Sequence, residues 1–562
     1  MRQIHMWSES EMREAMEGLR RFRRGILGPD VNALAVRGDK VSSALTLDHR
    51  HVRTVCLLWA LTFTAQLWGQ SQTGLSLQEA VRITIERQPE ILAQKQLVES
   101  ARGSLVAAGG QFDSMLQAYL SVEHEDSPLT REIQNELQLS SLKTDTASYG
   151  IGVEKQFRTG LTLNPTISFQ RIEDNSTNVT APNYGTANLQ ITQPLMRGFG
   201  RDDVAAAERS AAADYRAAVD TLHHTMATDA VNAVVAYWDY VGYQQVLAAR
   251  KETEELAHNL LDQTKALIEA DQRPASEINK VTANLASATA QRISAEQDLY
   301  EAKQNLGLAI GLNWEEIEAM REPSDDFPEV DENDLPSLSS IGSFVQTALV
   351  ERGDLAAARE TRESARILSV GAVKASRPQL DLGVGLGFEG IVEGKEPSHF
   401  LTAFTDNVPG PSLNASLTFG WPFGNRSAVG LVEQNEAEHR QAIIAADDLA
   451  RRIASSVAAA LSSVRQRGLQ LKKAEEAAAA YRVAVSNETQ IHQAGLSTTL
   501  EVIQTEDLLS SALIDLVSAR HDYAVAVALL RYQTGTLMRF DSSGAVTAIE
   551  LMSLPSIEAP PE

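Results

Sequence analysis

The sequence predicts a mainly helical protein in two similar halves, with a β-strand region set into each half. Residues 193–201 (QPLMRGFGR) join an alternating, strand-like stretch to about seventy residues of Ala-rich helical pattern. Residues 421–426 (WPFGNR) make the same transition later in the chain. Both halves have helical segments of matching length: about 37 residues before the strands, about 70 after them and about 37 returning. A duplication explains why so unusual a transition occurs twice.

Composition narrows the class of protein. The chain has 562 residues, of which 22% are charged and 43% hydrophobic, which is ordinary for a folded protein. Its formal net charge is −24. Sequence-independent binding of nucleic acid needs clustered Lys and Arg, so the charge argues against it. The acidic balance fits a soluble or periplasm-facing surface, and it also fits a conduit for cations.

The N-terminal region contains a predicted secretory signal peptide at residues 50–69. Its apolar run, 55–67, follows Arg50 and Arg53 and contains Cys56, the only cysteine. This run is shorter than the ~20 residues that a membrane-spanning helix needs, and small residues follow it. We expect cleavage near Gly69. Residues 1–49 are a doubtful extension, explained either by a start codon assigned too far upstream or by a genuine cytoplasmic segment.

The first half begins with helical spacing over residues 76–111, where Ser76 is the expected N-cap and Pro89 divides a short helix from a longer one. Four strands are expected between residues 116 and 195. A hairpin turn falls at Thr159-Gly160, and a polar loop at 173–184. The long helix then runs from Gly200 to about residue 271.

At 1.5 Å per residue this long helix is a rod of roughly 105 Å. The chain breaks at Pro274, and a helix over residues 275–312 returns to end at Gly311. The second half repeats this order after an acidic, Pro-rich linker. Its predicted elements are a helix at 339–376, strands at 380–388 and 412–421, a long helix at 427–493, a break at Gly495, and a returning helix at 498–534 that ends at Gly535.

These lengths predict an architecture. Two short helices placed end to end equal one rod, so each half forms two parallel columns of about 100 Å, with the strands at one end and the helix turns at the other. One chain cannot bury so long an array, so we expect oligomers. Strands with alternating faces cross an outer membrane only as a closed barrel, which several chains would have to complete together. The alternative is a soluble periplasmic β-domain.

The chain resembles the TolC-type outer membrane efflux proteins, the exit ducts of tripartite pumps and of type I secretion systems. The resemblance covers about residues 75–537, and its most specific parts are the segments 193–201, 421–426 and 492–504. It implies a first efflux repeat at 75–321, the linker at 322–337, a second repeat at 338–540 and a C-terminal tail at 541–562.

The resemblance also implies an assembly and a location. These are a homotrimer in the outer membrane, with a 12-stranded β-barrel on a 12-column α-helical barrel in the periplasm. The implied function is a passive, non-enzymatic duct without a cofactor. Its partners would be outer membrane lipid, a periplasmic membrane-fusion adaptor and an inner membrane pump of the RND, ABC or MFS type. A different class of function stays open, a periplasmic or surface structural protein with long coiled-coil stalks. The exported substrate cannot be read from the sequence.

The resemblance places a gate at the helix turns. The family's two pore-facing acidic positions fall on Glu501 and Gln504, so only one of them is acidic here. The residues Glu269, Asp271 and Glu277, near the first-half turn, would add charge to the gate, although a solvated helix end explains them equally well. Pro274 and Gly495 mark the two turns at this end of the pore.

The strand-to-helix junctions are predicted to be architectural and to bind no ligand. The residues that define them are Pro194, Gly198, Gly200, Trp421, Pro422 and Gly424. The prolines, which lack an N–H donor, are expected to end the strand ladders, and the glycines to permit the bend. Trp421 and Phe423 fit an aromatic belt at the membrane–water boundary, or alternatively core packing.

Two further features concern possible sites. Residues 146–172 read as an extra hairpin, because the family usually has two strands per half; this hairpin either joins the barrel or caps it. His223 and His224 are adjacent on a helix and lack a carboxylate or Cys partner at ligand spacing, so they are read as surface histidines. The adjacent acidic pair Glu506-Asp507 is likewise read as a solvated helix face.

Overall fold

The computed structural model describes residues 74–176, 182–330, 335–394, 402–404, 411–541, 544 and 546–555. The predictions for residues 1–73, including the signal peptide and Cys56, lie outside this range. Residues Gly74–Glu562 form one compact unit, which is described by itself. None of the helices described combines the length with the hydropathy that a membrane-spanning helix requires.

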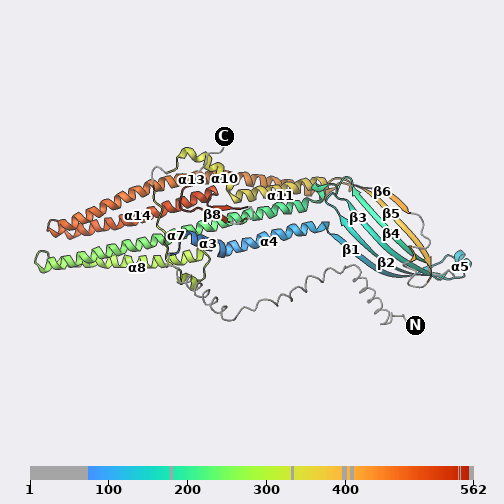
Figure 1. The fold of residues 1–562 in the computed structure, drawn as a ribbon, viewed down its shortest axis with the longest axis horizontal. Coiled ribbons are helices and arrows are strands. Elements are labelled where there is room, and N and C mark those ends of the chain that lie inside the picture. The colour runs from blue at the N-terminus through green and yellow to red at the C-terminus, as the bar shows by residue number, and fades with distance from the viewer. Residues whose placement is uncertain are drawn as a thin grey trace, which may run out of the picture. The chain divides into compact units, whose positions relative to one another are not determined.

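Four long helical segments build the first half (Figure 1). They are α3 (Leu77–Arg87), α4 (Pro89–Gly109), α7 (Ala206–Glu269) and α8 (Ile278–Ala309), with the short α6 (Arg201–Val204) before α7. The predicted division of the first helix is confirmed, and it falls at Gln88. Helix α7 packs along α8 over one part of its length and along α3 and α4 over another, as the predicted column arrangement requires.

The second half repeats this plan with α10 (Ile341–Glu351), α11 (Gly353–Ala375), α13 (Arg426–Gln493) and α14 (Thr499–Thr534). The prediction of one unbroken helix over residues 339–376 is wrong, because the chain leaves the helix at Arg352. Its ψ of 122° matches the 124° of Gln88, so the two halves break at corresponding positions. Only the first half marks this break with a proline, which is why the second break escaped prediction.

Glycine ends each returning helix against the break in the same half. Gly311 and Gly535 adopt φ values of +76° and +73°, which side-chain-bearing residues rarely do. A Cβ on Gly311 would lie 2.9 Å from the carbonyl carbon of Arg87, and one on Gly535 would lie 2.8 Å from that of Glu351. The predicted stops at both glycines are confirmed, and the close contacts show that each composite column is a tight end-to-end joint.

The principal core lies where these columns meet the middle of α7. Tyr237 and Trp238 are completely buried there. The ring of Phe327 stacks on Trp238 with centroids 5.2 Å apart, and Asp325 accepts hydrogen bonds from the Leu77 backbone at 2.6 Å and the Tyr237 hydroxyl at 3.0 Å. Part of the predicted linker therefore packs against the core, through the buried Phe327 and the hydrogen bonds of Asp325.

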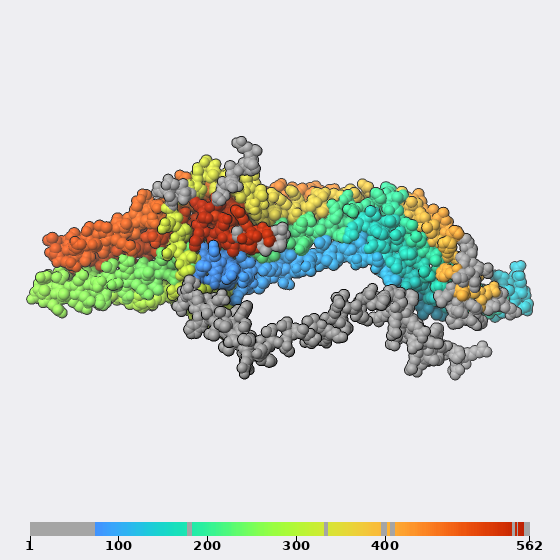
Figure 2. All heavy atoms as spheres, viewed as in Figure 1, coloured from blue at the N-terminus to red at the C-terminus, as the bar shows by residue number. Residues whose placement is uncertain are grey.

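The C-terminal segment is also structured beyond the second repeat. Strands β7 (Met538–Phe540) and β8 (Val546–Ile549) form a small hairpin, which the sequence did not predict. Arg531, almost fully buried, donates to the carbonyl oxygen of Ser553 at 2.5 Å and to the carboxylate of Glu550 at 2.8 Å. In Figure 2 these red residues lie against the blue start of the first helical region.

Smaller elements that the sequence did not predict are η2 (Gly110–Phe112), α5 (Arg131–Leu137), η3 (Ala275–Glu277), α9 (Trp314–Glu318) and η5 (Leu338–Ser340).

A six-stranded antiparallel sheet lies at the end of the columns opposite the helix turns (Figure 1). Its strands, in spatial order, are β1 (Ser114–Pro128), β2 (Ser141–Gln156), β3 (Thr162–Asp174), β4 (Pro182–Pro194), β5 (Gln379–Glu393) and β6 (Ser412–Gly420). The four strands predicted for the first half are confirmed. The two strands per half that the resemblance implies do not hold for this half, because the extra hairpin enters the sheet as β2 and β3.

The first junction bends after the strand rather than at its proline. Beyond Pro194, the nitrogen of Leu195 still donates to Leu380 at 2.7 Å, and that of Arg197 to Pro378 at 3.2 Å. Pro194 therefore does not end the pairing with β5, contrary to the prediction. On its other side the pairing with β3 ends at Thr192, so the missing N–H costs no ladder bond there. The bend itself uses the predicted glycines, with φ of +83° at Gly198, +88° at Gly200 and +81° at Gly424 of the second junction.

Candidate gate and membrane sheet

The two helix turns lie together at the end of the columns away from the sheet (Figure 1). In the first turn Asp271 adopts a φ of +55°, and Pro274 precedes the short helix η3. In the second turn Gly495 has a φ of +75°, and Thr498 caps the returning helix α14. Positive φ at Asp271 and Gly495 lets each long helix reverse direction within a few residues.

Contacts between the turns join the two halves of the chain. The Arg273 guanidinium donates to the backbone oxygen of Ser497 at 2.5 Å, and the Thr499 hydroxyl donates to the Glu277 carboxylate at 2.7 Å. Arg273 and Glu277, whose side chains are mostly buried, also form an ion pair at 3.9 Å. We call these four residues the tip latch. Because its hydrogen bonds involve charged groups, they are stronger than neutral ones.

Packing beneath the tip latch supports these contacts. His492 is buried and lies with its Nε2 atom 3.3 Å from the Thr499 hydroxyl oxygen. Burial lowers the pKa of His492, and the nearby Arg273 charge acts in the same direction. An apolar cluster from α7, α8 and α14 lies in the same region, formed by Leu260, Leu261, Val281 and Val502. The tip is therefore a packed junction between the halves.

Glu501, the leading gate candidate, caps α14. Its carboxylate accepts hydrogen bonds from the Thr498 nitrogen at 2.7 Å, the Thr498 hydroxyl at 2.9 Å and the Ser497 hydroxyl at 3.1 Å. These bonds, that from the Thr498 backbone first, hold the pKa of Glu501 below its usual value. The side chain is thus a fixed negative charge at the tip, with a structural role in addition to any role in the pore.

The other predicted gate residues separate into two groups. Gln504, Glu269 and Asp271 are exposed around the tip, where they are available to line a pore. Glu277 instead belongs to the tip latch. Sequence reasoning missed Arg273, Ser497 and Thr499, because contacts between residues more than 220 positions apart leave no local pattern. The sequence offered one indication of these contacts, which is that Arg273 is a lone basic residue in an acidic turn.

The prediction that Glu506 and Asp507 both lie on a solvated helix face is wrong for Glu506. It is buried on the face of α14 that packs against α7, whereas Asp507 is exposed. Burial raises the pKa of Glu506 to about 7, and the Asp507 charge adds to the rise. The sequence could not show which side of the helix is covered.

The sheet presents an extensive apolar surface to its surroundings. Leu116, Leu120 and Val122 of β1 are all more than 65% exposed, and so is Leu413 of β6. These residues alternate with polar neighbours along each strand, so they share one face. Monomeric soluble proteins rarely expose continuous apolar patches of this kind, which mark sites of contact with membrane or protein.

Comparison with known proteins identifies the second half. Residues 344–536, which run from α10 through α14, match the sequence profile described as outer membrane efflux protein. This part of the chain is therefore similar to outer membrane efflux proteins. The outer membrane efflux protein BepC from Brucella suis biovar 1 (strain 1330) is 22% identical over 359 residues, covering 63% of this chain and 72% of that protein.

Solved structures extend the likeness, at the level of the fold, to both halves of the chain. The outer-membrane channel OprN superposes with a TM-score of 0.60 at 15% identity, over 82% of this chain and 90% of that one. The outer membrane channel CmeC of Campylobacter jejuni gives 0.58 at 14% identity, over 82% and 85%. The resemblance to TolC-type outer membrane efflux proteins is thereby confirmed. OprN and CmeC are both described as outer membrane channels, which agrees with the predicted location.

The aromatic residues of the second junction lie on the surface of the chain. Trp421 is 44% exposed and Phe423 is completely exposed, so core packing is excluded for Phe423. Asn425 fixes the bend, since its side-chain amide donates to the Ser376 carbonyl at 2.9 Å. An aromatic belt at the boundary of the membrane stays a prediction.

His223 was predicted to be a surface residue, but its ring stacks on that of Phe540, with centroids 4.2 Å apart.

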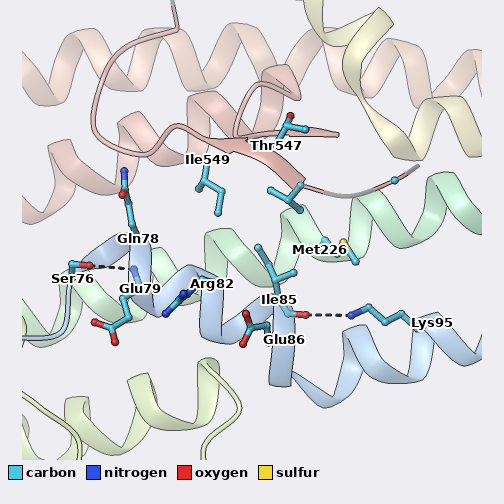
Figure 3. A pocket seen from close by; sticks show the side chains of 12 residues that line it. Ser76, Gln78, Glu79, Arg82, Ile85, Glu86, Lys95, Met226, Thr547 and Ile549 are labelled. Carbon is cyan, nitrogen blue, oxygen red and sulfur yellow. Dashed lines mark hydrogen bonds between the residues drawn. The ribbon is translucent and has the colours of Figure 1, made fainter. Parts of the chain in front are cut away.

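A cavity of about 900 Å³ opens beside α3, at the start of the first helical region. Figure 3 shows Gln78 and Ile85 of α3 on the side toward Ile549 of β8, whereas Glu79 and Glu86 extend away from that strand. The charged residues that line the cavity are of both signs, and Glu79 already forms an ion pair with Arg321 at 2.5 Å. Among the residues described, no three His, Cys, Asp or Glu side chains are grouped so as to hold a metal ion. We assign no ligand to this cavity.

Proposed function

We propose that the chain forms a passive exit duct in the outer membrane, assembled as a homotrimer. The observation that carries the proposal is the pairing of the efflux protein match with a sheet that exposes large apolar side chains on one face, from β1 at one edge to β6 at the other. Such a face is stable in lipid, provided that the sheet has no open edge. The helical columns then lie in the periplasm and enclose the path that cargo follows.

The edges of the sheet support assembly from several copies. Among the described strands, β1 pairs only with β2, and β6 pairs only with β5. An exposed edge carries unpaired N–H and C=O groups, which lipid cannot satisfy. Pairing of β1 from one copy with β6 from the next closes the sheet into a barrel. Three copies would also supply twelve helical columns, four from each chain.

The tip latch supports a gating role for the turns. Its hydrogen bonds hold the α7–α8 and α13–α14 hairpins together within one chain. In the resting state the tips close the path, and contact with a periplasmic adaptor breaks the latch and moves the hairpins apart. Packed helices with two alternative arrangements are a common basis for such switching. An inner membrane pump of the RND, ABC or MFS type then drives the cargo.

Membrane fractionation tests the proposal. We expect the full-length protein in the outer membrane fraction, as a trimer that dissociates on heating before electrophoresis. Purified trimers in planar bilayers should form ion-conducting channels. A soluble monomer that fails to insert into bilayers would overturn the proposal in favour of a structural protein with coiled-coil stalks.

A further inference from the structure

The hairpin formed by β2 and β3 carries the same two faces as the rest of the sheet. One row of directly paired residues crosses five strands and is apolar throughout: Ala118, Ile151, Ile167, Ala187 and Phe388. The next row, on the opposite face, is Tyr119, Gly150, Ser168, Thr186 and Glu389. The apolar face therefore passes across the hairpin without interruption, which is the pattern of a strand pair with lipid on one side.

Charged side chains bound this apolar face at the end away from the helices. His124 of β1 pairs with Asp145 of β2 at 2.6 Å, and Asp126 pairs with Lys143 at 3.6 Å. The helix α5 connects β1 to β2 beyond these pairs (Figure 1). The hairpin thus ends in polar structure on the same side as the other strands, as a membrane strand must where it reaches water.

The opposite end of the hairpin is fixed to the first strand-to-helix junction. The Gly200 nitrogen donates to the Thr159 oxygen at 3.1 Å, and a Cβ on Gly160 would lie 2.0 Å from the oxygen of Gly198. The Arg158 guanidinium pairs with Glu208 of α7, with Nε 2.7 Å from the carboxylate. These contacts set the depth of the hairpin at the level where β4 meets the helices, and they leave it no freedom to fold over the sheet as a cap.

We propose that β2 and β3 are membrane strands that widen the duct. This inference rests on the trimeric duct proposed above. Three chains with six strands each give eighteen strands, in place of the twelve expected from the resemblance. Because barrel diameter grows roughly linearly with strand number, the membrane section is about 1.5 times wider than a twelve-stranded one.

The inner face indicates the class of cargo that the wider section admits. Alternation along the ladders places seven charged residues on this face among the described strand residues, all of them acidic: Glu123, Glu125, Glu154, Asp174, Asp381, Glu389 and Glu393. On β5, Gly383, Gly385 and Gly387 leave room for polar side chains from the adjacent strands to lie across the backbone. The geometry fits a bulky, hydrophilic cargo that is not a polyanion.

Paired cysteine variants test whether the hairpin spans the membrane. In a Cys56→Ser background, Ile167→Cys and Ser168→Cys report on the two faces of β3. Ala187→Cys and Thr186→Cys, their direct partners on β4, serve as the reference pair. In outer membrane vesicles, a membrane-impermeant maleimide should label the Ser168 and Thr186 variants at least about tenfold faster than the other two, because lipid excludes the reagent.

The outcomes separate this inference from the proposed function. Equal labelling of Ile167→Cys and Ser168→Cys, with the β4 pair still different, would place the hairpin in water and overturn the inference while leaving the duct intact. Equal labelling within both pairs would contradict the membrane barrel itself.

A shortened variant tests the width directly. Val122, Ala147, Arg171 and Asn183 form one row, so replacing residues 124–181 with Asn-Gly brings Val122 opposite Asn183 with both faces kept. Single-particle electron microscopy should count eighteen strands in the native trimer and twelve in the variant. The cut-off radius for polymers entering the outer mouth should fall about 1.5-fold. Twelve strands in the native trimer would overturn the inference, whether or not the variant assembles.

Discussion

At the scale of single residues, Glu501 combines a charge and a cap, and the two can be separated by substitution. Gln also serves at this position of a capping box, so Glu501→Gln removes the charge while retaining the cap. Glu501→Ala removes both. If the carboxylate faces the pore, both variants lose cation preference to the same extent, and only Glu501→Ala unfolds at lower temperature. Reversal potentials in a salt gradient and thermal unfolding in detergent measure the two effects.

The same comparison can remove Glu501 from the pore. Unchanged cation preference in Glu501→Gln, with reduced stability in Glu501→Ala, would leave it a purely structural residue. Asp271 and Gln504 would then be the next positions to substitute, because they are exposed at the same tip.

Glu506 predicts a stability that depends on pH. Its folded-state pKa of about 7 lies above the ordinary value of 4.5, so the folded protein retains this proton more strongly than the unfolded chain does. Stability is therefore lost as pH rises from about 4.5 to 7. Glu506→Gln should be more stable than the parent at pH 8 by on the order of 3 kcal/mol per chain, and nearly equal to it at pH 4.

Thermal unfolding at both pH values checks the Glu506 prediction. An exposed acid farther along α14 supplies the control, since Asp515→Asn removes the same charge outside the packed face. A stability difference between Glu506→Gln and the parent that is equal at pH 4 and pH 8 would show that ionisation of Glu506 is not its source.

At the scale of elements, the tip latch should hold the two helix hairpins closed. Arg273→Ala removes a hydrogen bond from a charged donor, worth about 1.5–3 kcal/mol. The open probability of single channels should then rise by about tenfold or more. Lys265→Ala is the matched control, because Lys265 is exposed and its ion pair is with Asp262 of its own helix. Equal gating in the two variants would show that the latch does not keep the channel closed.

The joints within the columns give a second prediction at this scale. Gly535→Ala places a Cβ at 2.8 Å from the Glu351 backbone at a φ of +73°. We expect a loss of more than about 1 kcal/mol of stability. Gly103→Ala, in α4, meets open space and should instead gain up to about 1 kcal/mol. Denaturant unfolding of both variants measures whether the loss of stability in Gly535→Ala comes from the joint or from replacing a glycine in general.

The elements also show what sequence can and cannot predict. Long helices were predictable because their periodicity persists over many turns, and Pro274, Gly311, Gly495 and Gly535 mark where they end. The break at Arg352 was not predictable in this way, because Gly353 follows it where Pro89 follows the break of the first half. The four strands of the first half were predicted from alternation, but the place of the hairpin in the sheet depends on pairing with distant strands. The tip latch was hidden for the same reason.

At the scale of the whole molecule, the two halves share one plan, and the hairpin is the main departure from it. The second half alone matches the efflux protein profile, whereas solved channels superpose on 82% of the chain. The duplicated plan includes small details. Both halves break a helix at the same place, and both dock a glycine there. Geometry is thus retained between halves where residue identity is not, since Pro89 corresponds to Gly353.

The joints at Gly311 and Gly535 have a consequence for the movement of the molecule. Helices α7 and α13 run unbroken from the junctions to the tips, whereas the columns beside them are each divided in the middle. Displacement of the tips must therefore bend α7 and α13, whereas the two divided columns can rotate at their joints, which lie at Gly311 and Gly535. We expect the helical segments between these joints and the tips to move outward together when the duct opens. The segments on the sheet side of the joints should stay in place, so that the circumference of the sheet does not change.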